Sequence, residues 1–319
     1  MYCLTAKVRI ISQISQKQWD IDRISSVRIL RDTESLTDTC TLTLPRSIRW
    51  EGQKEVPFRP GDMVQVHLGY DGDTELAFRG YIRRIKRGNP MTLELEDEMY
   101  QMKKLSAVKK AYKSTTIRQL LEDQGTGCRL RVMGEQHLGR YRVTVQTVAE
   151  LLSDLRKQGI RSFFCTESGS PVLYAGVLFD HPKRPTQVLR TGQNIVTDNT
   201  EQQRAEDMKL RVKVVAISPD NKKTEVELGD KGGELRTLTC YNKSKEEAKA
   251  WGEQEMKRLK RDGLTGKLTT FGYRLLDKLD TVGVVIDGQR MGIYQINKNT
   301  ITFGTSGYRQ EVELGRRVN

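Results

Sequence analysis

The sequence predicts a mainly β protein of the α+β class, in which two similar small β-barrel domains flank an α/β insert domain. Short runs of alternating apolar residues dominate both ends of the chain, and helical patterns gather between them. The two β-rich ends also repeat one order of strands and turns. We therefore place the first barrel at residues 1–100, the insert at 101–190 and the second barrel at 191–319.

The repeat consists of two matching stretches of sequence. In each, an aspartate opens an alternating strand, a glycine turn follows, a second strand begins at a glycine, and a third alternating strand closes the copy. Two similar units in one chain predict a protomer with two quasi-equivalent faces, which suits the building of rings. The first copy comprises Asp62, 63–70, Gly80 and 91–97, and the second comprises Asp280, 281–286, Gly292 and 308–314.

Residues 1–100 predict strands punctuated by turn residues. Asp71-Gly72 is a hairpin signal, and Pro57 and Pro60 keep the segment before Gly61 out of a central strand. Six short strands in this span fit a small barrel or sandwich. The expected strands are 6–11, 27–31, 39–44, 63–70, 78–86 and 91–96.

The insert and the segment after it predict helices with recognisable starts. A helix is expected at 115–124, and another begins at a capping box formed by Thr147 and Glu150. A hairpin is expected over 161–179. A long helix at about 244–262 begins at a second capping box, Ser244 to Glu247, within the second barrel domain.

Composition limits the classes of partner. The 319 residues carry a formal net charge of +13, which indicates an acidic partner or nucleic acid, or simply a surplus of solubilising lysines. The five cysteines are far apart, as in proteins of a reducing compartment. Charges interrupt the N-terminus where a signal peptide needs an apolar core, and no run approaches the ~18–20 apolar residues that span a bilayer. We expect assembly in the cytoplasm, without a secretion signal or a membrane anchor.

No motif predicts chemistry. None of the histidines (His67, His137 and His181) pairs with another ligand at metal-binding spacing, and no phosphate or dinucleotide loop is present. Glu94 and Glu96 alternate with leucines, which makes them the solvent face of a strand rather than an acid/base pair. We therefore expect no catalytic residue, no cofactor and no metal. A cell-wall hydrolase with a site assembled from distant residues is the enzymatic alternative.

Basic residues on two expected strands are the candidate subunit or partner interface. The alternative is that they are ordinary solvated faces. A nucleic-acid-binding module is the competing function, although such proteins usually interleave aromatics with basic residues and here the aromatics lie elsewhere. The candidates are Arg83, Arg84, Lys86, Arg87, Arg211 and Lys213.

The order of several motifs resembles the baseplate hub proteins of contractile phage tails, a family related to the hub portion of type VI secretion spike proteins and to phage late-control proteins. The resemblance covers essentially the whole chain. In the second copy, Lys278-Leu279-Asp280 departs from the motif Pro60-Gly61-Asp62. The matching motifs are a strand ending in Leu44-Pro45, Pro60-Gly61-Asp62, Gly80-Tyr81-Ile82, Gly192-Gln193-Asn194-Ile195 and the closing strands from Met291 and Gly307.

The resemblance implies a structural role. Family hubs are homotrimers whose two barrel-like domains alternate around a ring, joining the tail tube (or a tube-initiator protein) to the central spike. The insert would contact other baseplate proteins, and DNA or effector would pass only as cargo. The implied location is the virion baseplate. No lysozyme-like or spike domain follows the hub motifs, so the resemblance implies that those activities lie on another polypeptide.

Overall fold

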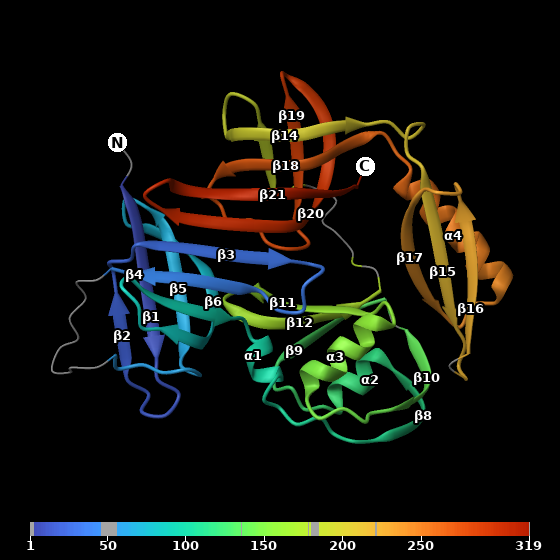
Figure 1. Ribbon diagram of the computed structural model, residues 1–319, viewed down its shortest axis with the longest axis horizontal. Coiled ribbons are helices and arrows are strands. Elements are labelled where there is room, and N and C mark those ends of the chain that lie inside the picture. Colours follow the sequence, from blue (N-terminus) through green and yellow to red (C-terminus); the bar gives the residue numbers. More distant parts are fainter. Residues whose placement is uncertain are drawn as a thin grey trace.

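The computed structural model describes residues 3–45, 56–134, 136–177, 179, 185–220 and 222–318. The chain is mainly β, as predicted, and its described strands form four sheets (Figure 1). His181 lies outside the described residues. One sheet has 13 strands and contains both β-rich ends of the chain. The other three sheets are small, with two or three strands each.

The first β unit contains the strands that the alternating pattern of residues 1–100 predicts. Its apolar residues point into one core because every second side chain of a strand faces the same way. The 39–44 and 63–70 predictions match the observed strands. The unit comprises β1 (Leu4–Ile11), β2 (Gln18–Ile21), β3 (Ser26–Asp32), β4 (Thr39–Leu44), β5 (Met63–Tyr70), β6 (Asp73–Lys86) and β7 (Met91–Glu96).

The insert packs its helices on small sheets around a second core. The capping box of Thr147 and Glu150 is confirmed. The expected helix at 115–124 is shorter, since residues up to Thr116 form a strand and the Thr116 hydroxyl accepts the N–H of Gln119. The elements are α1 (Met99–Met102), β8 (Ala111–Thr116), α2 (Ile117–Glu122), β9 (Arg129–Met133), β10 (His137–Arg142), α3 (Val148–Lys157), β11 (Arg161–Glu167) and β12 (Ser170–Gly176).

The second β unit lies in the same large sheet as the first and has its own apolar core. Its first strand, β13, pairs in parallel with β19, which places residues 187–190 in this sheet rather than in the insert. The unit comprises β13 (Gln187–Arg190), β14 (Ile195–Gln203), β18 (Gly263–Phe271), β19 (Thr281–Ile286), β20 (Gln289–Gly304) and β21 (Gly307–Arg317).

A side module stands apart from that sheet within the predicted second barrel domain. Its helix begins at the capping box of Ser244 and Glu247, as predicted, but ends at Leu259. A methyl group on Gly252 would lie only 2.5 Å from a Val214 methyl, so a glycine lets the helix pack closely on its sheet. The module comprises β15 (Leu210–Ile217), β16 (Lys223–Gly229), β17 (Glu234–Tyr241) and α4 (Lys245–Leu259).

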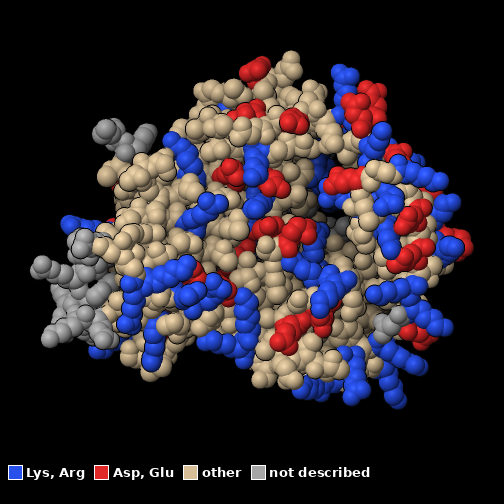
Figure 2. Space-filling model, viewed as in Figure 1, with Lys and Arg blue, Asp and Glu red and all other residues tan. Residues whose placement is uncertain are grey.

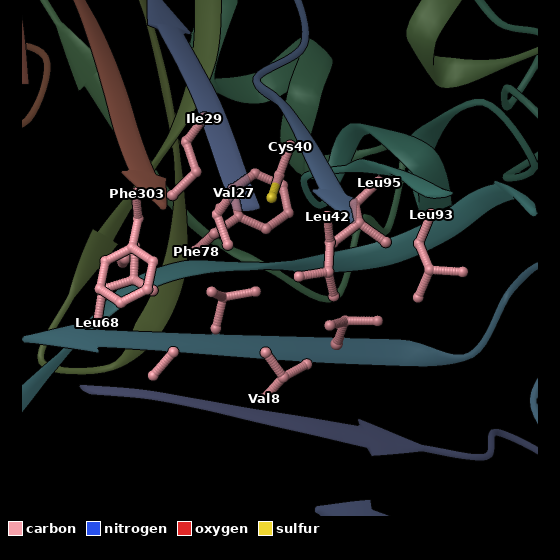
Figure 3. Packing of buried hydrophobic residues seen from close by; sticks show 14 of the residues in the cluster. Val8, Val27, Ile29, Cys40, Leu42, Leu68, Phe78, Leu93, Leu95 and Phe303 are labelled. Carbon is pink, nitrogen blue, oxygen red and sulfur yellow. The ribbon is translucent and has the colours of Figure 1, made fainter. Parts of the chain in front are cut away.

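The prediction of two closed barrels is not confirmed. None of the described sheets closes on itself. Instead β20 pairs with β3, so the two β units continue into one another, as the successive strands β14, β18, β21, β20, β3 and β4 show in Figure 1. The side chain of Phe303, on β20, enters the core of the first β unit beside Val27 and Leu68 (Figure 3). At this junction β3 pairs with β20, so the outer edge of β3 is not available to close the first β unit on itself.

Candidate functional site

The two β units repeat one order of strands. In the first β unit the order is β1–β5–β6–β7–β4–β3, and in the second it is β13–β19–β20–β21–β18–β14. The units differ at one end, because β1 is antiparallel to β5 whereas β13 is parallel to β19. The repeat that the sequence indicated therefore extends to six strands in each unit.

A β-bulge occurs at matching places in both units. The pairing of β5 with β6 shifts between Val66 and His67, and that of β19 with β20 shifts between Val284 and Val285. These positions are equivalent when counted from Asp62 and Asp280. Since a bulge sets the local bend of a strand, both hairpins bend at the same point.

A second bulge also recurs. The pairing of β6 with β7 shifts after Ile82, and that of β20 with β21 shifts after Ile296. Both residues donate their N–H to the carbonyl oxygen of the opening aspartate, at 2.9 Å from Asp62 and 3.0 Å from Asp280. The two units therefore share a detailed backbone register as well as a strand order.

This register corrects one detail of the sequence alignment. Gly80 pairs with Val64, and the residue that pairs at the equivalent position of β19, Val282, is Tyr294. The counterpart of Gly80 is therefore Tyr294, two residues beyond Gly292. The sequence alignment, which matched Gly80 with Gly292, is therefore displaced by two positions.

The opening aspartates perform the same local task. Asp62 accepts the N–H of Arg59 at 2.9 Å, and Asp280 accepts the N–H of Asp277 at 2.7 Å, each three residues upstream. The second oxygen accepts from Gln13 N–H in the first unit and from the Thr186 hydroxyl in the second. Each aspartate therefore fixes the turn that leads into the central hairpin of its unit.

The junction between the units is a strand pair with a largely apolar face. Residues 27–32 of β3 pair with 298–303 of β20, and Ile29 lies opposite Ile301. Because β21 occupies the other edge of β20, β19 and β3 share one edge of this long strand. The junction is thus the contact by which one β unit accepts a strand from the other.

A buried charged cluster lies beside this junction. Lys278 and Asp38 are 3% and 7% exposed, and Lys278 Nζ lies 2.7 Å from Asp38 Oδ2. The ammonium group also lies 4.9 Å from the centre of the Phe163 ring in the insert. Arg31 donates to the carbonyl oxygens of Leu276 and Ala77, at 3.0 and 2.6 Å. Side chains of this cluster therefore join the first β unit, the insert and the second β unit.

Burial and mutual charge shift the protonation of this cluster. Burial, with Asp38 adding repulsion, raises the pKa of Asp97 to about 8. Burial also raises the pKa of Asp38, against the opposing attraction of Lys278. Burial opposes the charge of Lys278, but the carboxylate of Asp38 and its neighbours outweigh it and raise that pKa. The adjoining cavity has a volume of about 30 Å³, the size of a water site rather than of a substrate site.

Sequence reasoning did not identify Arg31, Asp38, Asp97 or Lys278. One signal pointed toward them, namely that Lys278 stands where the first copy has Pro60. A lysine that replaces the proline of such a turn brings a positive charge, and a buried charge needs a partner of opposite charge. The structure supplies that partner from a residue 240 positions away in the chain.

The predicted basic residues fall into two separate groups. Arg83, Arg84, Lys86 and Arg87 lie exposed at the end of β6 and in the turn after it. Arg83 pairs with Glu94 at 2.7 Å, and Lys86 pairs with the same carboxylate, whose hydrogen bonds to both bases lower its pKa to about 2. Within the described chain, Arg84 and Arg87 make no ion pair.

Arg211 and Lys213 lie on β15 in the side module, on the opposite side of the molecule from β6 (Figure 1). Lys213 pairs with Glu225 at 2.7 Å. The structure therefore does not bring the six predicted residues into one patch. Figure 2 likewise shows lysines and arginines spread over this face with acidic side chains among them.

Comparison with solved structures identifies the fold. The tail protein of Neisseria meningitidis MC58 is similar over 98% of this chain and 96% of its own, with a TM-score of 0.66 and 16% identity. The chain has the fold of a phage tail protein. The 43 kDa tail protein of prophage MuSo2 from Shewanella oneidensis is similar over 98% of this chain and 97% of its own, with a TM-score of 0.60 and 16% identity.

A component of a type VI secretion system has a similar fold as well. The E. coli c3393 protein, described as a type VI secretion component similar in structure to the T4 tail proteins gp27 and gp5, matches 98% of this chain and 77% of its own. Its TM-score is 0.58 at 12% identity. These neighbours confirm the predicted resemblance to the baseplate hub family at the level of the fold. No family model and no curated protein matches the chain.

Two further features concern metal binding and membrane insertion. Among the described residues, no group of three or more histidine, cysteine, aspartate or glutamate side chains could hold a metal ion. None of the helices in the described chain has the length and apolar character needed to cross a bilayer.

Proposed function

We propose that this chain is the structural baseplate hub of a contractile tail or of a tail-like injection machine. Three copies form a ring of six quasi-equivalent β units that joins the tail tube, or a tube-initiator protein, to the central spike. The insert contacts other baseplate proteins, and DNA or effector passes through the ring as cargo. The protein acts as a scaffold of the virion baseplate and catalyses no reaction.

The observation that carries this proposal is the repeat of strand order, bulges and opening aspartate in the two β units. A ring of three chains can present sixfold-like symmetry only if each chain supplies two similar units. Contacts in such a closed ring are heterologous, so the first β unit of one protomer packs against the second β unit of its neighbour. The tail-protein fold of the neighbouring structures supports the same role.

Native mass spectrometry at moderate salt tests the proposal. We expect a species near three times 36.5 kDa. A monomer across the whole concentration range would contradict the trimeric ring. Binding to random duplex DNA is measured in parallel over a series of salt concentrations. A monomer with a steep decrease in DNA affinity as salt rises would favour the nucleic-acid-binding alternative.

A further inference from the structure

We propose that β14 of one protomer adds as a strand to the end of β6, from Arg83 to Lys86, in a second copy of this chain. The contact reproduces between chains the pairing that β3 makes with β20 within one chain. This inference rests on the proposed ring and names the strands and the register that close it.

The acceptor edge lies at the end of β6. In the second β unit, one edge of β20 pairs first with β19 and then, further along the strand, with β3. In the first β unit, β5 occupies the equivalent edge of β6 only as far as Tyr81 and the hydrogen bonds of Ile82. From Arg83 to Lys86, the described residues pair with β6 only through β7 on the opposite edge. This stretch of β6 is therefore the counterpart of the part of β20 that accepts β3, and no described strand pairs with it on this edge.

The donor strand is β14. It occupies the position in the second β unit that β3 occupies in the first, and it ends the large sheet (Figure 1). Within the described chain, β14 pairs with β18 along its length, and most of its residues are exposed. Its first residue, Ile195, also forms a bridge to Thr191, outside the stretch that the proposal uses. Copying the internal junction onto the repeat therefore makes β14 the donor and the end of β6 the acceptor.

The repeat also predicts the register. Asp198 pairs with Leu268 as Val27 pairs with Leu42, so each residue of β14 has a defined counterpart in β3. The shared bulges likewise match residues 84–86 of β6, and Arg87 just after it, to 298–301 of β20. When each residue of β3 and β20 is replaced by its counterpart in β14 and β6, the β3–β20 pairs give the pairs expected between chains. They are Arg84 with Gln203, Ile85 with Gln202, Lys86 with Glu201 and Arg87 with Thr200.

The charges of the two edges agree with this register. β14 carries Asp198 and Glu201 and contains no lysine or arginine, whereas the acceptor stretch is strongly basic. The register places Lys86 directly opposite Glu201, and opposite charges at facing positions stabilise a strand pair. The internal junction instead has Ile29 opposite Ile301. Polar and charged edges let the free subunit stay dissolved before it meets its neighbour.

Cysteine cross-linking tests the register, in a Cys3→Ser background because Cys3 is the exposed thiol. Lys86→Cys/Glu201→Cys places two thiols at facing positions, within reach of a disulfide if the strands pair as proposed. Lys86→Cys/Gln202→Cys is the matched control, since a shift of one residue turns the second thiol to the other face. After mild oxidation, we expect covalent dimers and trimers at least tenfold more abundant for the first pair than for the second.

Three outcomes separate this inference from the proposed function. A native trimer that gives the Lys86→Cys/Glu201→Cys cross-link supports both. A native trimer with no excess of that cross-link over the control overturns the strand addition and leaves the ring. A monomer throughout overturns the ring and the strand addition together. Thermal melting of each variant shows whether the fold is intact.

Charge reversal gives an independent reading. Glu201→Lys places two lysines opposite one another at each contact, and we expect the trimer to dissociate at a concentration at least tenfold higher. Glu227→Lys makes the same change on an exposed position of β16 and serves as the control. Equal effects of the two variants would overturn the proposed pairing of Lys86 with Glu201.

Discussion

Lys278 and Asp38 form an ion pair of 2.7 Å in which both side chains are almost completely buried. Lys278 belongs to the turn that opens the central hairpin of the second β unit, and Asp38 immediately precedes β4 of the first. A charge buried in this way is stable only beside its partner. The pair therefore links the two β units at a second place, in addition to the strand pairing of β3 with β20.

Removing one partner of this pair should be strongly destabilising. Lys278→Met leaves the Asp38 carboxylate buried without its counter-ion, and we expect a loss of about 3–5 kcal/mol in the free energy of unfolding. Urea denaturation measures it. Lys278→Met/Asp38→Asn removes both charges and should recover more than half of the loss. An unchanged loss in the double variant would contradict the ion-pair explanation, and Lys113→Met at an exposed position is the control.

Asp97 should make stability fall as pH rises. Its pKa is about 8 in the folded chain and lies near 3.9 in an unfolded one, so between these values the folded state binds the extra proton. The contribution to the free energy of unfolding therefore decreases from about pH 4 to pH 8, by up to about 1.4 kcal/mol per pH unit. We expect Asp97→Asn to reduce this slope, measured by denaturation at several pH values, whereas Asp38, whose pKa burial also raises, keeps its own contribution. A wild-type slope that persists in Asp97→Asn, as in the control Asp220→Asn, would refute the assignment.

Phe303 should stabilise the junction through its insertion into the first β unit. The side chain is 7% exposed and packs in the core beside β3 and β5 (Figure 3). Phe303→Ala should cost about 3–5 kcal/mol, because it removes buried apolar area and leaves a cavity. Ile14→Ala, at a side chain that is 72% exposed, should change stability by no more than about 0.5 kcal/mol. Similar values for both would show that the junction contributes little.

Equivalent aspartates should have equivalent effects. Asp62→Ala and Asp280→Ala each remove the acceptor of two hydrogen bonds at matching turns. We expect each to lose about 1–3 kcal/mol of unfolding free energy, because the donors are left partly buried without partners. Asp22→Ala, at an exposed position, is the control. A loss at only one of the two turns would argue against their common role.

The basic end of β6 should control trimer formation. Arg84→Gln/Arg87→Gln removes two charges that have no ion pair within the described chain, and it avoids placing a negative charge opposite Glu94. We expect at least a tenfold rise in the concentration at which the trimer dissociates, and a weaker salt dependence of assembly. Arg211→Gln/Lys213→Gln, in the side module, should leave the trimer unchanged. Native mass spectrometry at several salt concentrations measures both, and equal weakening would place the side module in the same interface.

Much of the local structure could be predicted from the sequence. The strands 39–44 and 63–70 follow from alternation, and the capping boxes of Thr147 and Ser244 identify two helix starts, because these signals depend on residues close together in the chain. The helix predicted at 115–124 is longer than the observed one, because its first two residues belong to β8, which pairs with β10. The glycine match of Gly80 with Gly292 missed the bulges, which change register without a consistent sequence mark.

The sequence by itself determined that the chain contains two similar β units, because the spacing, turn residues and alternation of each copy involve residues close together in the chain. Only the tertiary structure decided that β3 joins β20 and that β14 and the end of β6 keep unpaired edges among the described residues. Backbone edges are chemically alike in every strand, so the order of residues does not reveal which two will meet. The same limit hid the pairing of Lys278 with Asp38, whose burial arises only when distant segments pack together.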